Sequence, residues 1–372
     1  ACNHPDGLIG VALNPTEYER RWAEALPGRL ERCEVAVLDR TAWRLWHAYE
    51  FARQLLLLLP DDAARGQQLN AALRQATLAI DEANVSKSAP TALASIEAAL
   101  RGTGAPALYE GHAIGLAHID TAWLWPIRET RRKCLRAFSN VLRLMEQHAD
   151  LCFLATQPQQ YVWAKHDSPE LFAQIAARIR EKRWEIGGAT WVEPDCNAPS
   201  GESLVRQLLH GQSYWRENFP ELDPPRCLVL PDTFGFPASL PQIMALAGLD
   251  IFITNKMAWC DTNEFPYVSF RWRGIDGTEV LSHFTPGTDY NNRNTPAELR
   301  RYEQMTARRD RAQTGMWLQT FGFGDGGGGP SEEQIANLRL GVQCEGLPKV
   351  TMGTLRGFRE ELIRRRETLR GQ

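Results

Sequence analysis

The feature that most constrains this 372-residue chain is a change of rhythm after Gly104. From there on, short apolar runs of strand length alternate with longer stretches of helical spacing. The strand-like runs are residues 113–117, 152–155, 184–188, 227–230, 251–254, 280–283 and 316–320. Continuous apolar runs are typical of parallel strands buried on both faces, which right-handed crossovers wind into an open sheet or a closed barrel.

Polar residues gather directly after these runs. His118 and Asp120 follow the first, Asp232 follows the fourth, and Asp325 follows the last. Functional side chains at the carboxyl ends of many strands are typical of barrel enzymes and, to a lesser degree, of open α/β sheets. We therefore expect an α/β fold over residues 104–372, namely a (β/α)7-type barrel.

Residues 1–103 predict a helical lead-in to this barrel. Apolar residues recur at helical spacing from about Glu17 to Arg101, with breaks at Pro60 and at residues 86–90, which suggests three helices. The stripe includes Trp22, Leu26, Leu30, Leu38, Leu45, Trp46 and Tyr49. We interpret it as a packing face.

Composition narrows the class of partner. A formal net charge of −3 gives no electrostatic reason to expect nucleic acid or an anionic membrane. The longest apolar run, 55–60, is too short to span a bilayer, and the first residues lack a signal-peptide pattern. We expect a cytoplasmic protein with a small, weakly charged ligand. Whether the chain forms a homo-oligomer is left open by the sequence.

The eight cysteines form no C-x-x-C pair, which argues against a zinc knuckle or a dithiol redox motif and favours free thiols. The sequence also begins at Ala1 without an initiating Met and ends in a charged, helix-like stretch. We therefore expect a fragment of a longer protein.

The segment A-H-I-D-T-A-W-L-W-P, residues 117–126, contains a candidate metal half-site. In an extended segment His118 and Asp120 project to the same side, so an imidazole nitrogen and a carboxylate oxygen can converge on a cation. Trp123 and Trp125 follow, and aromatic faces beside a metal suit the apolar face of a sugar ring. Their alternative role is to fill the core.

The segment L-V-L-P-D-T-F-G-F-P, residues 228–237, delivers Asp232 into a turn after an apolar run. A buried carboxylate must be paired, hydrogen-bonded or metal-bound, unless Asp232 instead caps a helix near Pro237. With His118 and Asp120 it supplies the three protein ligands of a catalytic metal site with an open position. Hydrolysis is the simplest chemistry, with Asp232 as ligand or as a nucleophile on an anomeric carbon.

Five motifs in order carry a family resemblance: H-I-D-T-A-W-L-W-P, G-G-A-T-W-V-E-P-D-C-N-A-P-S-G-E-S, L-P-D-T-F-G-F, T-N-K-M-A-W and G-F-G-D-G-G-G-G-P. Over roughly Glu110 to Leu362 the chain resembles the α-mannosidases of glycoside hydrolase family 38, most closely the branch with the cytosolic and many bacterial enzymes. The resemblance implies that a further metal-ligating His, a helical bundle and β-sandwich domains follow the barrel. We expect this stretch to end before all of them.

The resemblance also implies roles for individual residues. His118 and Asp120 would ligate a divalent cation, usually zinc with cobalt as the alternative, and Asp232 would be both ligand and catalytic nucleophile. Trp123 and Phe234 would pack around the terminal mannose. Lys256 and Tyr290 would make polar contacts to the substrate.

The remaining carboxylates have open roles. Glu193 and Asp195, in W-V-E-P-D-C-N, would orient ligands, reach substrate or form buried ion pairs. A retaining glycosidase needs an acid/base carboxyl about 5 Å from its nucleophile, and Asp325 in the Gly-Asp motif is our candidate. Its alternative is a polar residue on a glycine hinge. Asp195 is the fallback acid and His283 the fallback fourth ligand.

The sequence therefore predicts a retaining exo-α-mannosidase that removes terminal α-mannosyl residues from oligosaccharides by metal-assisted double displacement. One alternative is a metal-dependent polysaccharide deacetylase or amidohydrolase, which also places His and Asp at strand ends around zinc. Another is a catalytically incomplete carbohydrate-binding fragment.

Overall fold

The protein is described by a computed structural model that covers residues 2–4, 7–12, 32–60, 62–102, 109–287, 289–310, 314–342 and 344–365. Its first elements are strands β1 (Cys2–His4), β2 (Gly7–Ala12) and β3 (Arg32–Ala36), which pair antiparallel in one small sheet. The helical pattern did not predict this sheet. Trp22, Leu26 and Leu30 lie outside the described residues.

Three helices follow, as predicted: α2 (Arg40–Leu56), α3 (Ala64–Ala79) and α4 (Val85–Leu100). Helix α2 begins where the Asp39 carboxylate accepts hydrogen bonds from the N–H groups of Thr41 and Ala42. The break predicted at residues 86–90 is wrong, because α4 runs through Pro90. Burial of Ala89, Leu93 and other apolar residues on the same face outweighs the one hydrogen bond that the proline removes near the helix start.

The rest of the chain alternates strands and helices, and all seven predicted strands are present. The strands are β4 (Glu110–Leu116), β5 (Phe153–Leu154), β6 (Trp184–Glu185), β7 (Cys227–Val229), β8 (Ile251–Thr254), β9 (Ser269–Arg273), β10 (Glu279–Phe284), β11 (Met316–Phe321) and β12 (Lys349–Met352). The helices are α5 (Ile127–Gln147), α6 (Pro158–Asp167), α7 (Pro169–Arg180), α8 (Gly201–Asn218), α9 (Leu240–Leu246), the 3-10 turn η1 (Lys256–Trp259), α10 (Pro296–Arg309), α11 (Glu332–Gly341) and α12 (Leu355–Arg364). Strands β9 and β12 were not predicted.

The strands form two sheets in the order β11-β4-β5-β6 and β7-β8-β10-β9, with β12 also paired to β4. Every pairing is parallel except the β9–β10 hairpin. The N–H of Leu318 on β11 donates to Nε2 of His283 on β10, which brings the two sheets together. The α/β class and its helical lead-in are thus confirmed, and the strands predicted for the (β/α)7-type barrel are hydrogen-bonded as two sheets that meet between β10 and β11.

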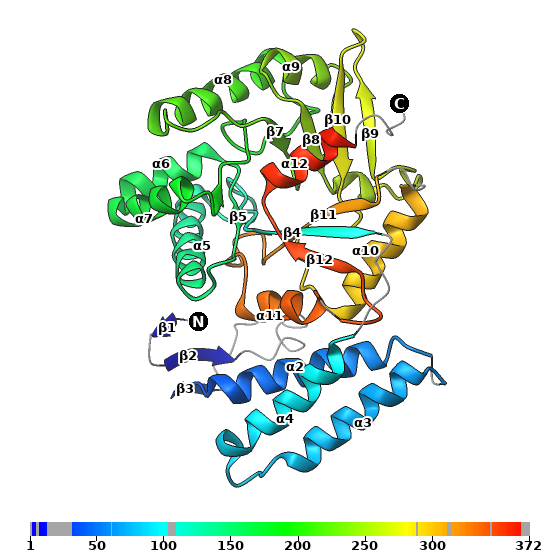
Figure 1. Ribbon diagram of the computed structural model, residues 1–372. Helices are drawn as coiled ribbons and strands as arrows, with labels where there is room; N and C mark the ends of the chain where they lie inside the picture. The colour runs from blue at the N-terminus through cyan, green and yellow to red at the C-terminus, as the bar shows by residue number, and fades with distance from the viewer. Residues whose placement is uncertain are drawn as a thin grey trace, which may run out of the picture.

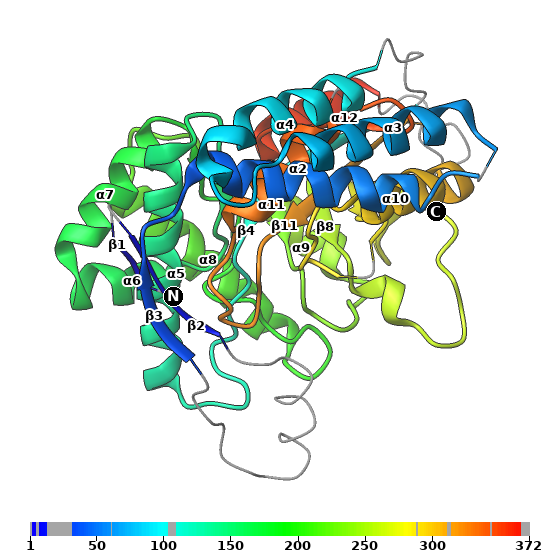
Figure 2. The same cartoon turned by 90° about the horizontal axis from the view of Figure 1, so that it is seen from below.

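Helices surround the two sheets, and α2, α3 and α4 lie together beneath α11 and α10 (Figures 1 and 2). Arg300 of α10 donates to the carbonyl of Leu58, and Arg40 of α2 donates to Glu332 of α11. One apolar cluster runs from the lead-in helices into the sheet. The domain boundary near residue 103 stays a prediction. Among the described residues, no helix has the length and apolar character needed to cross a membrane.

The seven cysteines whose side chains are described are all free: Cys33, Cys134, Cys152, Cys196, Cys227, Cys260 and Cys344. Four of them are buried. Burial raises the pKa of the Cys134 thiol to about 12, so this thiol stays protonated and behaves as a small apolar side chain.

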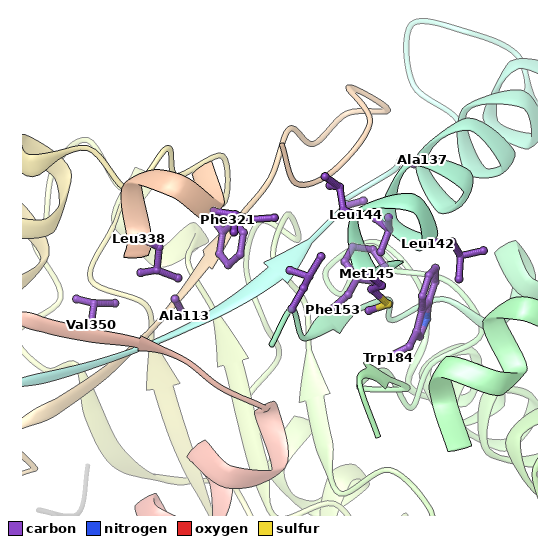
Figure 3. Packing of buried hydrophobic residues seen from close by; sticks show 14 of the residues in the cluster. Ala113, Ala137, Leu142, Leu144, Met145, Phe153, Trp184, Phe321, Leu338 and Val350 are labelled. Carbon is purple, nitrogen blue, oxygen red and sulfur yellow. The ribbon is translucent and has the colours of Figure 1, made fainter. Parts of the chain in front are cut away.

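Phe153 on β5 lies at the centre of the apolar packing under α5, and the centroid of its ring is 4.6 Å from the ring centroid of Trp184 (Figure 3). It is fully buried. We expect Phe153→Ala to lower the free energy of unfolding by about 3–5 kcal/mol, because the lost contacts leave a cavity that the core fills only partly. Urea unfolding measures the change, with Leu246→Ala as control because Leu246 is 90% exposed. Equal effects of the two substitutions would contradict this picture of the core.

Candidate metal and carbohydrate site

The carboxyl ends of the strands deliver the predicted site residues to one cavity. It has a volume of about 520 Å³. All nine predicted residues line it: His118, Asp120, Trp123, Asp195, Asp232, Phe234, Lys256, Tyr290 and Asp325. Residues more than 200 positions apart meet there because parallel β4 and β11 pair in register and end side by side.

His118 is the buried centre of this cavity. Its Nε2 lies 3.4 Å from Oδ1 of Asp120 and 3.5 Å from Oδ2 of Asp232. Its Nδ1 lies 2.9 Å from Oε2 of Glu193. Burial alone would lower the pKa of His118, but these three carboxylates outweigh it and raise that pKa well above its ordinary value. The site is therefore built to hold positive charge.

Asp232 follows β7 and its two oxygens have different partners. Oδ2 faces His118, whereas Oδ1 lies 2.5 Å from Nζ of Lys256. Burial alone would raise the pKa of Asp232, yet His118 and Lys256 together hold it below its ordinary value. Asp232 is therefore an ionised carboxylate, as both a metal ligand and a nucleophile must be.

Lys256 begins η1 and is buried among aromatic rings. Its Nζ lies 3.8 Å from the ring centroid of Trp259, 4.6 Å from that of Phe234 and 5.3 Å from that of Tyr290. Cation–π attraction and the Asp232 carboxylate thus fix the ammonium group in one place.

Asp325 follows β11 at the start of the glycine run. Its Oδ1 accepts a hydrogen bond of 2.6 Å from the hydroxyl of Tyr290. Burial and this carboxylate raise the pKa of Tyr290, which keeps its hydroxyl protonated as a donor. Donor atoms of His118, Asp232 and Asp325 all lie within 4.8 Å of one another. Asp325 is therefore close enough to serve either as a ligand or as the acid/base.

These residues fit a divalent cation. One imidazole nitrogen and several carboxylate oxygens converge, a donor set that suits zinc and related ions. Oδ2 of Asp120 is buried and has no hydrogen-bond partner among the described residues. A buried carboxylate oxygen without a partner is costly, and a bound cation would remove that cost.

Aromatic side chains form the mouth of the cavity. Trp123 and Phe234 are more than half exposed, as is Trp259, whose ring meets that of Phe234 edge-on at 5.9 Å. Trp125 instead donates a hydrogen bond from Nε1 to Thr130, and the ammonium group of Lys133 lies over its ring, so Trp125 packs on α5. Exposed aromatic faces at a polar cavity suit the apolar faces of sugar rings.

The two fallback assignments are not supported by the geometry. Oδ1 of Asp195 accepts from the N–H groups of Asn197 and Ala198, and these bonds lower its pKa, which disfavours a proton donor. His283 is buried within the strands, where burial lowers its pKa to about 3. Its Nδ1 bonds Ser269 and its Nε2 accepts from Leu318, so neither nitrogen is left for a metal.

Sequence reasoning assigned no site role to several residues of the cavity. Gln157, Trp259, Asp289 and Asn291 also line it. Trp259 ends the motif T-N-K-M-A-W, which was the signal for it. Gln157 directly follows the second apolar run, but the hydrogen bonds from its amide to Ile119 and from Thr121 to its carbonyl could not be read from the sequence.

Comparison with known proteins gives the family. Residues 109–369 match the family described as "Glycosyl hydrolases family 38 N-terminal domain". The chain belongs to this family of glycoside hydrolases, and the resemblance inferred from the five motifs is confirmed.

Curated relatives agree. The chain is 37% identical to alpha-mannosidase 2C1 of Mus musculus, in an alignment that covers 95% of this chain and 33% of the mouse protein. It is 38% identical to an alpha-mannosidase of Saccharomyces cerevisiae, over 68% of this chain and 24% of the yeast protein. The chain therefore spans about a third or less of these relatives.

A solved structure has the same fold. The crystal structure of an alpha-mannosidase from Enterococcus faecalis V583 superposes with a TM-score of 0.58 at 21% identity, covering 70% of this chain and 30% of that one. At this level of identity the likeness concerns the fold alone.

Proposed function

We propose that this chain is the catalytic barrel portion of a retaining exo-α-mannosidase acting on the terminal α-mannosyl residues of oligosaccharides. The observation that carries the proposal is the convergence of His118, Asp232 and Asp325 within 4.8 Å, inside a cavity with an aromatic mouth. The names of the curated relatives support the mannose specificity.

His118, Asp120 and Asp232 would hold one divalent cation, zinc or alternatively cobalt, and Asp325 lies near enough to join them. Bound there, such a cation would grip vicinal hydroxyls of mannose and stabilise developing charge as a Lewis acid. The buried, unpartnered Oδ2 of Asp120 supports this role.

The chain's own residues account for the remaining chemistry. Asp232, ionised and held by Lys256, attacks C1 of the mannosyl group while Asp325 gives its proton to the leaving oxygen. Asp325 then takes a proton from water, which attacks C1 and releases mannose with retained configuration. The Tyr290 hydroxyl orients the Asp325 carboxyl throughout. Trp123 and Phe234 shelter the sugar face, and Asp195 lies at the edge of the cavity.

The proposed setting is the cytoplasm, with a mannose-containing oligosaccharide as substrate and neither nucleic acid nor membrane as partner. The formal charge of −3 and the free thiols support it. Family membership argues against the deacetylase alternative, whereas the incomplete sugar-binding fragment stays an alternative that the following experiment decides.

We expect chelation to lower hydrolysis of p-nitrophenyl α-mannoside by this chain by about 100-fold or more, because Lewis-acid stabilisation contributes several kcal/mol to the transition state. Zinc or cobalt, added back separately, should restore it. A sample carried through the same dialysis without chelator is the control. Unchanged hydrolysis after chelation would refute metal assistance. Mannose binding without hydrolysis under every metal would favour the incomplete fragment.

A further inference from the structure

Glu193 contacts two different parts of the site with its two oxygens. It lies in the loop after β6, and its side chain is 7% exposed. Oε2 lies 2.9 Å from Nδ1 of His118. Oε1 accepts from the N–H of Asp232 and, at 3.2 Å, from the hydroxyl of Thr233. One buried carboxylate thus joins the loop after β4 to the loop after β7.

The side of His118 that Glu193 contacts is the one that faces away from the other two carboxylates. Nε2 faces Asp120 and Asp232, so Nδ1 is the nitrogen left for a supporting partner. Nδ1 of His118 and Oε2 of Glu193 are both buried and have no hydrogen-bond partner of good geometry among the described residues, although the two atoms lie 2.9 Å apart. A metal-bound histidine commonly presents its second nitrogen to a carboxylate, which fixes the ring and makes it a better ligand.

The loop around Glu193 is itself held in place. The backbone N–H of Glu193 donates to Oε1 of Gln157. The side-chain amide of Gln157 donates in turn to the carbonyl of Ile119, which lies between His118 and Asp120. Gln160 bonds that carbonyl as well. The Glu193 backbone and the His118–Asp120 segment are therefore both hydrogen-bonded to Gln157, the residue directly before α6.

We propose that Glu193 is a positioning residue that holds His118 in its cation-binding orientation and, through the other oxygen, holds the backbone of Asp232. This inference rests on the proposed function. A purely structural buried carboxylate would affect stability alone, whereas a positioning residue also sets cation affinity and the order of the Asp232 turn.

The test uses the fact that an amide has one acceptor atom where a carboxylate has two. In Glu193→Gln the side-chain carbonyl is expected to stay with the backbone N–H of Asp232, so the NH₂ group faces Nδ1 of His118. With a cation on Nε2, Nδ1 carries a proton, and the two donors then oppose each other. We expect the dissociation constant for zinc, measured by competition with a chromophoric chelator, to rise about 10–100-fold.

In Glu193→Ala both contacts are lost. Amide hydrogen exchange in the peptide that contains Asp232, measured without metal, should then be faster than in the wild type. Glu185→Gln and Glu185→Ala are the matched controls, because Glu185 is a partly buried carboxylate that accepts the N–H groups of Leu355 and Arg356 in a different cavity. They should leave zinc affinity and this exchange unchanged.

A zinc affinity of Glu193→Gln within about threefold of the wild type would overturn the His118 part of the inference, since support of this kind is worth at least tenfold. Equal exchange in Glu193→Ala and Glu185→Ala would overturn the Asp232 part. A wild-type chain that binds neither zinc nor cobalt would refute the proposed function, and the exchange comparison would still decide whether Glu193 holds the Asp232 turn.

Discussion

Asp232→Asn is expected to lower kcat for an α-mannoside by about 10⁴-fold or more, the range seen when a member of a catalytic nucleophile unit is removed. The physical reason is that an amide cannot form and release the glycosyl ester that a retaining mechanism requires. Asn keeps the size of the side chain and one oxygen towards the cation, so the fold should be retained. Steady-state hydrolysis measures the loss.

A labelling experiment on the same variant locates the covalent bond between sugar and protein. A fluorinated mannosyl substrate should label the wild-type chain on the peptide that contains Asp232, and should leave Asp232→Asn unlabelled. Asp223→Asn serves as the control because Asp223 is an exposed carboxylate outside the cavity that contains Asp232. Residual turnover above trace level, or label on another residue, would refute the nucleophile assignment.

Asp325→Asn is expected to lower kcat by about 10²–10⁴-fold for a mannosyl oligosaccharide, because its leaving oxygen needs a proton. The loss should be much smaller for p-nitrophenyl α-mannoside, whose leaving group departs without protonation. Added azide should restore turnover on this activated substrate, since a small anion attacks the glycosyl-enzyme without a general base. Rates on the two substrates, with and without azide, measure the effect.

The amount of cation bound by Asp325→Asn distinguishes the two roles that the position of Asp325 allows, namely acid/base and metal ligand. Asp325 lies within 4.8 Å of donor atoms of His118 and Asp232, as a ligand would, and accepts from Tyr290, as an oriented acid would. As the acid, its loss should leave bound metal nearly unchanged. Loss of metal together with equal losses on both substrates would instead assign Asp325 as a ligand.

The sequence was sufficient for the parts of the site that follow from strand periodicity. His118, Asp120, Asp232 and Asp325 each lie within four residues of the end of a strand, and parallel strands bring their carboxyl ends to one edge. Contacts between loops could not be predicted in this way. Glu193 was left with open roles because nothing in its neighbours says which oxygen faces which partner.

The errors of prediction in the fold have similar physical causes. Strand β9 reads Ser-Phe-Arg-Trp-Arg, an alternating edge strand beside β10 rather than a continuous apolar run. Strand β12 has only four residues and begins with an exposed lysine. In α4, Pro90 is a local break signal that tertiary packing overrides.

The pairing of β4 also bears on the order in which this protein becomes functional. β4 pairs with β5, its next strand in sequence, over only two residues, but with β11 over six and with β12 over four. The strand that presents His118 and Asp120 thus gains most of its ladder from partners more than 200 residues later. Because such distant contacts are slow to close, the site should be assembled late in folding, and recovery of cation binding after dilution from denaturant should follow recovery of helical structure.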